Sequence, residues 1–330
     1  MYSLGIDQGG TKTVAIVAGD DGHILGRGFG AGACHFFDGL PKAMAAVETA
    51  VQQALAQAGL APSDLRAVSA GMAGANWPEE IAALETGLRK LLPAEDVRVC
   101  NDCLIALRGG TANPCCAVIC AGTGLNVAVR LTTDPHFIYN NYIEDMDQGA
   151  KALGARALRA IFLSEIGALP PTTLTETALS FFELDRVERL LLAWQRQQLS
   201  KPIQNFSPLL FAAAEKSDRL ALDILYQFAL SVCRYPIAAI QKYGAGREEI
   251  DVVLSGGLFK TKNALLSETI AAEIHRVAPA ARIIEAEYEP VVGAMLQLLD
   301  NTYQGAIPPS VMQNCRASAE KLELLRIKSK

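Results

Sequence analysis

Three glycine-rich turns in this sequence carry the kinds of groups that bind phosphate. Each follows an apolar run with the length and composition of a β-strand. Glycine allows backbone N–H groups to approach an anion closely, and threonine and serine add hydroxyl donors. The residues are Gly9, Gly10, Thr11, Lys12 and Thr13 in the first turn, Gly122, Thr123 and Gly124 in the second turn, and Ser255, Gly256 and Gly257 in the third turn.

The first turn is not a P-loop. The Walker pattern requires Gly-Lys-Ser/Thr, whereas Thr11 separates Gly10 from Lys12. A P-loop must also open a helix, whereas residues 13–18 read as a strand. The sequence instead predicts a hairpin turn, with Asp7 placed to hold Mg²⁺ through water. A plain glycine hairpin without a ligand is the alternative, but the same device recurs in the second turn, which favours two hairpins that clamp a polyphosphate.

Alternating strand and helix signals surround the first turn. The first three strands are expected to be antiparallel because short turns join them, and the first helix stops at Gly59, where a C-cap glycine is expected. The predicted order is strands over 2–7, 13–18 and 23–28, a helix over 42–58, a strand over 65–71, a helix over 78–92 and a strand over 96–100.

A related pattern starts again after the turn-rich segment 109–114. It opens with a strand, the second turn and another strand, and a mostly helical region from 147 to about 242 then interrupts it. Residues 311–330 are expected to form a solvated amphipathic helix or tail. The remaining predicted elements are strands over 115–120, 126–131 and 137–139, clear helices over 153–163 and 219–239, a strand over 250–254, a helix from 262 and a strand over 282–285.

Length and composition predict two domains and a small-molecule partner. The chain has 330 residues, 50% of them hydrophobic, which exceeds the size at which one core usually keeps growing. A cleft between two domains is then the expected ligand site. The net charge is -5 and the basic residues are scattered, so nucleic acid is not an expected partner. The sequence lacks a signal-peptide pattern and any apolar stretch of about 18 residues, so we expect a soluble, cytoplasmic protein without a membrane partner.

The eight cysteines fit a reducing compartment, because several lie in apolar runs where a free thiol behaves as a small hydrophobe. Cys100 and Cys103 form a CxxC pair, and Cys115, Cys116 and Cys120 crowd one predicted strand. A second CxxC pair and a histidine at ligand spacing are both lacking in the sequence. Buried thiols are therefore favoured over a metal site.

The ordered set of turns resembles the BadF/BadG/BcrA/BcrD-type ATPase family, in its branch of N-acetylglucosamine and glucosamine kinases. The resemblance covers the chain to about residue 300 and implies the actin/hexokinase/Hsp70 superfold. This is an α/β fold with two ribonuclease-H-like, actin-like ATPase domains around a central cleft, the second with a helical insert. The implied boundaries are 1–112 for the N-terminal domain, joined by a helix over about 290–302 that contains Gly293-Ala294, 113–289 for the C-terminal domain with an insert over about 150–245, and 303–330 for a tail or helix.

The resemblance also implies ATP and Mg²⁺ as cofactors and a small sugar as substrate. The first and second turns are similar to the family's phosphate loops, and the third to its adenosine-side motif. Asn101-Asp102 is similar to the pair whose carboxylate is the general base, which must deprotonate the attacking hydroxyl. Met146 to Ala150 is similar to the segment whose Asp contacts the sugar, which assigns Asp147 and Gln148 to the substrate. For Asp102 and Asp147, capping of a helix N-terminus is the alternative.

The chain departs from the family pattern where the sugar should bind. Cys34 stands where members carry Asn, and His35 matches a histidine of some members, although a lone histidine is also common in a structural role. Leu125 replaces a serine, whereas Asn126 matches the following asparagine. Residues 140–143, Asn-Asn-Tyr-Ile, replace Gly-Gly-Trp-Gly. A thiol in place of an amide changes which polar edge of a ligand is satisfied, so the substrate can differ from N-acetylglucosamine.

The leading interpretation is an ATP-dependent amino-sugar kinase of the N-acetylglucosamine or glucosamine type, with in-line transfer of the γ-phosphoryl group. One alternative is an ATPase activator of a 2-hydroxyacyl-CoA dehydratase or benzoyl-CoA reductase type, with an iron–sulfur cluster. Cys120 lies in the strand before the second turn, where a cluster ligand would compete with phosphate binding. Another alternative is a sugar and ATP sensor without turnover, although no DNA-binding helix pair is evident. A homodimer is compatible with each interpretation.

Overall fold

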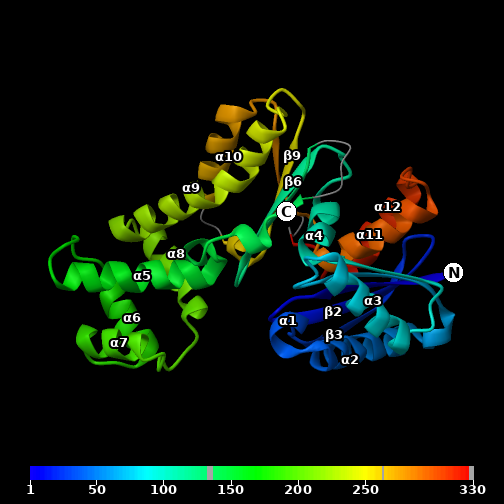
Figure 1. Ribbon diagram of the computed structural model, residues 1–330, viewed down its shortest axis with the longest axis horizontal. Coiled ribbons are helices and arrows are strands. Elements are labelled where there is room, and N and C mark those ends of the chain that lie inside the picture. Colours follow the sequence, from blue (N-terminus) through cyan, green and yellow to red (C-terminus); the bar gives the residue numbers. More distant parts are fainter. Residues whose placement is uncertain (132–136, 262–263, 327–330) are drawn as a thin grey trace. The chain divides into compact units, whose positions relative to one another are not determined.

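The computed structural model describes residues 1–131, 137–261 and 264–326 (Figure 1). The chain divides into two compact units, one made of 1–118 with 284–330 and the other of 119–283. Within the described residues there are two five-stranded sheets, with the strand orders β3-β2-β1-β4-β5 and β10-β9-β6-β7-β8. The α/β prediction with two sheet-containing parts is confirmed.

The first sheet joins an antiparallel meander to two parallel strands. β1 pairs antiparallel with β2, and β2 with β3, as the short turns predict. β4 lies parallel to β1 on its other side, and β5 lies parallel to β4. The carboxyl ends of β1, β4 and β5 therefore share one edge of the sheet. The strands are β1 (Tyr2–Gln8), β2 (Lys12–Gly19), β3 (Ile24–Ala31), β4 (Leu65–Met72) and β5 (Asp96–Asn101).

Helices cover both faces of this sheet because β2 is buried on both sides. Ala15 and Val17 pack into a core with α2 (Leu40–Ala58) and α3 (Pro78–Leu91). Their neighbours Val14 and Ile16 face the opposite core, which contains α11 (Pro290–Thr302) and α12 (Pro309–Lys321). Alternate strand residues point to opposite faces, so a continuous apolar strand needs cover on each. α1 (His35–Asp38) and α4 (Asp102–Gly110) complete the helices of this unit.

The prediction of a solvated C-terminal helix is wrong. α12 lies beside α11 (Figure 1). It buries Val311 and Cys315 in the same core as residues of β2 and α11. The Ser318 hydroxyl also accepts a hydrogen bond from the backbone N–H of Ile24 at 2.9 Å. The mixed charges that suggested solvation occupy the other positions of the helix. Residues 327–330 of the predicted tail lie outside the described residues.

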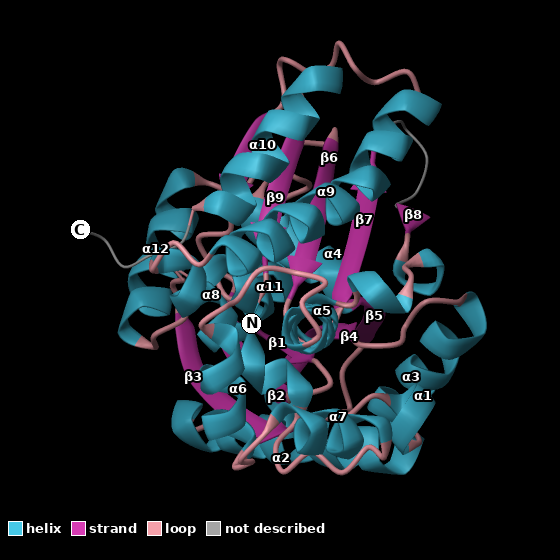
Figure 2. Cartoon of the chain, turned by 90° about the vertical axis from the view of Figure 1, so that its left-hand side faces the viewer, coloured by secondary structure: helices cyan, strands magenta, loops and turns pink. Residues whose placement is uncertain are grey.

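The second sheet carries a predominantly helical segment between two of its strands. Figure 2 shows β6, β7 and β9 side by side, with β8 at the edge. The helical segment starts at 149, four residues earlier than the first clear helix predicted, and α10 packs against α9. The start of the predicted helix at 262 lies outside the described residues. The elements are β6 (Cys116–Ala121), β7 (Leu125–Arg130), β8 (Phe137–Ile138), α5 (Gly149–Glu165), α6 (Leu174–Phe182), α7 (Val187–Gln195), α8 (Ser207–Glu215), α9 (Arg219–Lys242), β9 (Asp251–Ser255), α10 (Leu265–Val277) and β10 (Arg282–Glu285).

Among the helices that the structure describes, none combines the length and apolar character needed to cross a membrane.

Two glycines let α4 and α11 cross in close contact. A Cβ atom on Gly293 would lie 1.8 Å from the carbonyl oxygen of Ile105 and 2.8 Å from the amide nitrogen of Gly109. Both neighbours are backbone atoms, which cannot move aside alone. A Cβ on Gly109 would lie 3.6 Å from the Cα of Gly293, an ordinary contact distance. A methyl group therefore fits at Gly109 but not at Gly293, although the two glycines face each other.

We predict that Gly293→Ala lowers the free energy of unfolding by about 2 kcal/mol or more, because the helices must separate to admit the methyl group. Gly109→Ala at the same crossing is the control, and it should be neutral or slightly stabilising because alanine favours a helix. Denaturant titration of both variants measures the difference. Equal stability of the two variants would contradict this account of the crossing.

Candidate active site

The shared carboxyl edge of β1, β4 and β5 brings two acidic residues together. The strand register pairs Asp7 with Gly71 and Gly71 with Cys100, two residues before Asp102. Both carboxylates are partly buried. Side chains far apart in the sequence thus meet because parallel strands end at the same level.

Asp102 is the first residue of α4, and the cap of that helix is Asn101. The Asn101 side chain accepts a hydrogen bond from the backbone N–H of Cys103 at 3.0 Å. Its amide group also donates to the side-chain oxygen of Asn76 at 2.7 Å. The helix-capping alternative for Asp102 is therefore wrong, because its neighbour provides the cap.

The surroundings favour the protonated form of both carboxylates. Burial raises the pKa of Asp102 to about 6, although the backbone N–H groups of Cys103 and Asp102 partly offset the effect. Burial and the negative charge of Asp102 raise the pKa of Asp7 to about 7, against the opposing charge of Lys12. The Lys12 ammonium lies 3.6 Å from a carboxylate oxygen of Glu289. Two carboxylates that repel each other in a partly buried place are the oxygen donors that suit a divalent cation, so Asp7 and Asp102 fit Mg²⁺.

The first turn is held firmly and presents an open glycine. The backbone N–H of Gly9 donates to the carbonyl of Lys12 at 3.0 Å, and the Gly9 carbonyl accepts from the N–H of Ala33 at 3.2 Å. A Cβ on Gly10 would meet none of the described atoms within 4 Å. Chain packing therefore does not require glycine there, which is consistent with close approach of a ligand. Thr13 is buried in β2 and its hydroxyl donates to the carbonyl of Ala31 at 2.7 Å, so this group is already engaged.

Cys34 and His35 lie against the loop that follows β4. The Cys34 thiol donates to the carbonyl of Ala73 at 3.5 Å, and both side chains limit the space at Gly74. Burial raises the pKa of this thiol, and the negative charges of Asp102 and Asp38 add to the shift, which places Cys34 in the electrostatic field of Asp102. The His35 ring is mostly buried, 3.9 Å from a carboxylate oxygen of Glu80, and its nitrogens have no hydrogen-bond partner among the described atoms.

The second turn is clamped by the beginning of α5. The backbone N–H groups of Ala150 and Lys151 donate to the carbonyls of Gly122 and Thr123 at 2.8 and 3.2 Å, and the N–H of Gly122 donates to the carbonyl of Gly124 at 2.9 Å. All three carbonyl groups of the turn are thus engaged.

The third turn lies against the second. Gly256 has φ of 100°, and a Cβ there would lie 2.2 Å from the carbonyl oxygen of Ala121, so the turn needs glycine. A Cβ on Gly122 would lie 3.9 Å from the backbone nitrogen of Gly257. Ser255 is buried at the end of β9. The glycines of the second and third turns therefore lie next to each other in space within their unit.

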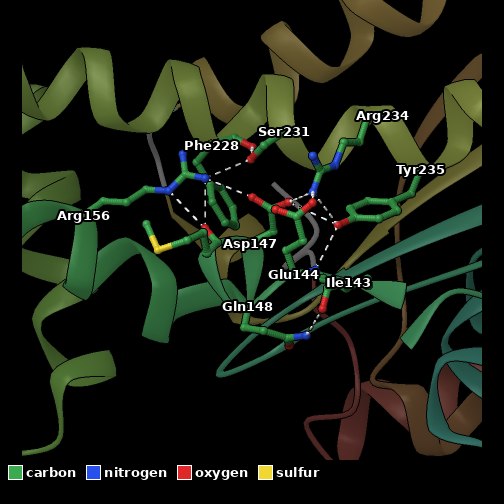
Figure 3. A network of polar contacts seen from close by, with 10 residues as sticks. Ile143, Glu144, Asp147, Gln148, Arg156, Phe228, Ser231, Arg234 and Tyr235 are labelled. Carbon is green, nitrogen blue, oxygen red and sulfur yellow. Dashed lines mark hydrogen bonds and ion pairs between the residues drawn. The ribbon is translucent and has the colours of Figure 1, made fainter. Parts of the chain in front are cut away.

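The buried Asp147 lies at the centre of a polar network (Figure 3). One carboxylate oxygen accepts from Arg156 at 2.9 Å, and the other accepts from Arg234 at 2.6 Å and from the Tyr235 hydroxyl at 3.1 Å. The N-cap residue of α5 is Gln148, not Asp147, so the helix-capping alternative for Asp147 is not observed. Asp147, the residue expected to contact the sugar, is thus already bound by two guanidinium groups and a phenol.

Gln148 and Asn126 bind the chain's own backbone. Gln148 accepts from the N–H of Leu125 at 3.2 Å and donates to the carbonyl of Ile143 at 3.3 Å. Asn126 is buried in β7, where its side chain accepts from the N–H of Val127 at 2.8 Å.

Sequence reasoning assigned no role to several residues that shape these sites. They come from distant parts of the chain, and the glycine after Asp147-Gln148 was the one local signal. They are Asn76, Gly149, Arg156, Arg234, Tyr235 and Glu289.

The eight cysteines are spread over both units, and none of them is joined in a disulfide. Among the described residues, no group of three or more His, Cys, Asp or Glu side chains could hold a metal ion. Burial raises the pKa of Cys100 to about 12, which disfavours the thiolate form. Within the CxxC pair, Cys103 is buried and Cys100 is partly buried.

Two relatives carry names of amino-sugar kinases. Glucosamine kinase GspK of Vibrio cholerae is 28% identical over 247 residues, which cover 74% of this chain and 82% of the relative. N-acetyl-D-glucosamine kinase of Dictyostelium discoideum is 25% identical over 317 residues, covering 90% and 98%.

Solved structures share the fold. A candidate N-acetylglucosamine kinase from Chromobacterium violaceum matches with a TM-score of 0.72 and 22% identity, over 90% of this chain and 98% of that one. A ROK family glucokinase from Streptomyces griseus, solved with glucose and AMPPNP, matches with a TM-score of 0.60 and 17% identity, over 89% and 98%. These matches show a shared fold and confirm the predicted α/β class with two sheet-containing parts. The model of the BadF/BadG/BcrA/BcrD ATPase family matches residues 4–297, and the chain belongs to that family.

Proposed function

We propose that this protein is an ATP-dependent kinase of an amino sugar, of the glucosamine or N-acetylglucosamine type. The observation that carries the proposal is the pair Asp7 and Asp102 at one sheet edge beside the first turn. Phosphoryl transfer to a hydroxyl needs a carboxylate base and a place for Mg²⁺ and phosphate, and this edge supplies candidates for each. The relatives named as glucosamine and N-acetylglucosamine kinases support the choice of substrate class.

Asp102 acts as the general base in this proposal. A base works best when its pKa lies near the working pH, and burial raises the pKa of Asp102 to about 6. The ionised carboxylate then takes the proton of the sugar hydroxyl as that oxygen attacks the γ-phosphoryl group in line. Asn101 fixes the first turn of α4 and so holds the base in place.

Asp7 is the proposed holder of Mg²⁺, through water, with the first and second turns as phosphate-binding loops and the third turn on the adenosine side. When bound, the ion neutralises charge on the phosphates, and it also offsets the repulsion between Asp7 and Asp102. Gly10 and Thr11 are the proposed phosphate contacts of this loop, Gly9 shapes the loop through its hydrogen bond to the Lys12 carbonyl, and Lys12 adds a positive charge. Thr13 would support this loop from within β2.

Cys34 and His35 are the proposed contacts to the sugar beside the base. The Cys34 thiol lies in the field of Asp102, and the unpartnered ring nitrogens of His35 offer a donor and an acceptor once a substrate reorders this corner. Asn126 is a further candidate contact from β7. We propose a cytoplasmic setting, with ATP and the sugar as the partners and neither nucleic acid nor membrane involved; a homodimer is compatible with this role.

The activity is tested by coupled ADP release with glucosamine, N-acetylglucosamine and glucose as acceptors. We expect turnover with one of the two amino sugars. Asp102→Asn should lower kcat by about 10³-fold, since the base is lost, while the Kd for ADP stays within about twofold. Asp96→Asn, at the opposite end of β5, is the matched control and should retain full activity. Full turnover by the Asp102 variant would remove that residue from its assigned role.

The pH dependence of kcat/KM for the sugar should follow the ionisation of Asp102. Asp102 accepts a proton only when ionised, so kcat/KM should fall by about tenfold per pH unit as the pH drops below about 6. Rates measured at saturating ATP between pH 4.5 and about 8 test this expectation. A rate that stays constant down to the ordinary carboxylate pKa would contradict it.

The ionised Asp7 carboxylate should lower the free energy of unfolding at neutral and alkaline pH when no ligand is present. Its pKa rises from 3.8 to about 7 on folding, so the folded state keeps the proton that the unfolded state loses. The stability gained by keeping this proton is fully present below pH 3.8 and is lost as the pH rises through about 7. Asp7→Asn should therefore unfold at a higher temperature than the natural chain at pH 8, with little difference near pH 3.5. Thermal unfolding without nucleotide and with EDTA measures this; a destabilised variant at pH 8 would be the contrary result.

A further inference from the structure

The family resemblance assigns Gln148 to the sugar, but the hydrogen bonds of the Gln148 side chain connect it to the second turn. Its side-chain oxygen accepts from the backbone N–H of Leu125, the residue that directly follows the turn, at 3.2 Å. Its amide group donates to the carbonyl of Ile143 at 3.3 Å (Figure 3). One side chain therefore connects the exit of the second turn to the segment before α5.

The neighbouring Gly149 brings α5 into direct contact with the same turn. It has φ of 54°, and a Cβ there would lie 2.3 Å from the carbonyl oxygen of Gly124 and 2.6 Å from that of Gly122. A residue with a side chain would push the helix away from the turn. The contact allows the first N–H groups of α5 to reach the carbonyls of Gly122 and Thr123.

The clamp fixes the direction of the turn's donors. In a planar trans peptide the C=O of one residue and the N–H of the next point in opposite directions. The carbonyls of Gly122 and Thr123 point to α5, so the N–H groups of Thr123 and Gly124 point away from it. This orientation places N–H dipoles, rather than carbonyl oxygens, on the side of the turn that faces away from α5, which favours an anion there.

The network around Asp147 fixes the segment that carries Gln148. Arg156 donates both to Asp147 and to the backbone carbonyl of Met146, and it belongs to α5. Arg234 and Tyr235 hold the same carboxylate from α9. Both oxygens of Asp147 are thus occupied, and removing either arginine would leave a buried charge with one partner fewer.

We propose that Gln148 is a positioning residue for the second turn, and therefore for ATP, and is not a ligand of the sugar. Asp147 is the anchor that holds Gln148 in register with Leu125. The inference rests on the proposed kinase function, but it makes a distinct claim about which substrate each residue serves.

Gln148→Met tests this claim, because methionine keeps the length and loses both hydrogen bonds. We expect the KM for ATP and the Kd for ADP, measured by calorimetry, to rise by roughly tenfold, with the KM for the sugar within about twofold of the natural value. Gln241→Met makes the same change on an exposed position of α9 and should leave all three values unchanged. A raised sugar KM with unchanged ADP affinity would overturn the inference.

Gln148→Glu gives a second readout that a general loss of stability does not mimic. An ionised carboxylate still accepts from Leu125 but faces the carbonyl of Ile143, whereas a protonated one can donate to it. The ordinary glutamate pKa is about 4.3, and the facing carbonyl of Ile143 disfavours the ionised form. The ADP affinity of this variant, relative to the natural chain at each pH, should therefore recover as the pH falls from 8 to about 4.5. A ratio independent of pH would count against the proposal. A natural chain that binds ADP but phosphorylates no sugar would refute the kinase function alone, whereas one that binds no ADP would refute both.

Discussion

The repulsion between Asp7 and Asp102 is the constraint on which the candidate site depends. Two carboxylates are held at one sheet edge by strand pairing, not by attraction between them, and burial makes their ionisation costlier. Such an arrangement persists because the packing of β1, β4 and β5 supplies the stability that the pair removes. The remainder of the first unit serves that packing: helices cover both faces of the sheet, and Asn101 caps the helix that begins at Asp102.

In the second unit the corresponding constraint is geometric. A glycine-rich turn such as the second turn has little conformational preference of its own, so another element must select one conformation. Here the N-terminus of α5 and the Gln148 side chain do so, by occupying the carbonyl groups and the exit of the turn. Gly149 is the residue that makes this contact sterically feasible.

Much of the fold could be predicted from the sequence, because strand and helix periodicities and turn residues are local signals. The antiparallel start, the C-cap at Gly59 and the three glycine turns are all observed. The solvated character of α12 was predicted wrongly, because its mixed charges hid an apolar face. The partners of Asp147 could not be predicted, since Arg234 lies 87 residues away and neither arginine belongs to a motif. Likewise, the residue that caps α4 depends on backbone geometry, which Asn101-Asp102 as a dipeptide leaves open.

The packing of α11 and α12 also determines when the first unit can fold during synthesis. One of its cores combines residues of β2 and β3 with residues of α11, of α12 and of the segment after α12, from Val291 to Leu324. The second unit is continuous in sequence, from 119 to 283. A ribosome can therefore release all of the second unit before the first sheet gains cover on that face, so the apolar side of β2 stays exposed until nearly the last residues emerge. Chaperone contact during translation is then most needed by the part of the chain that is made first.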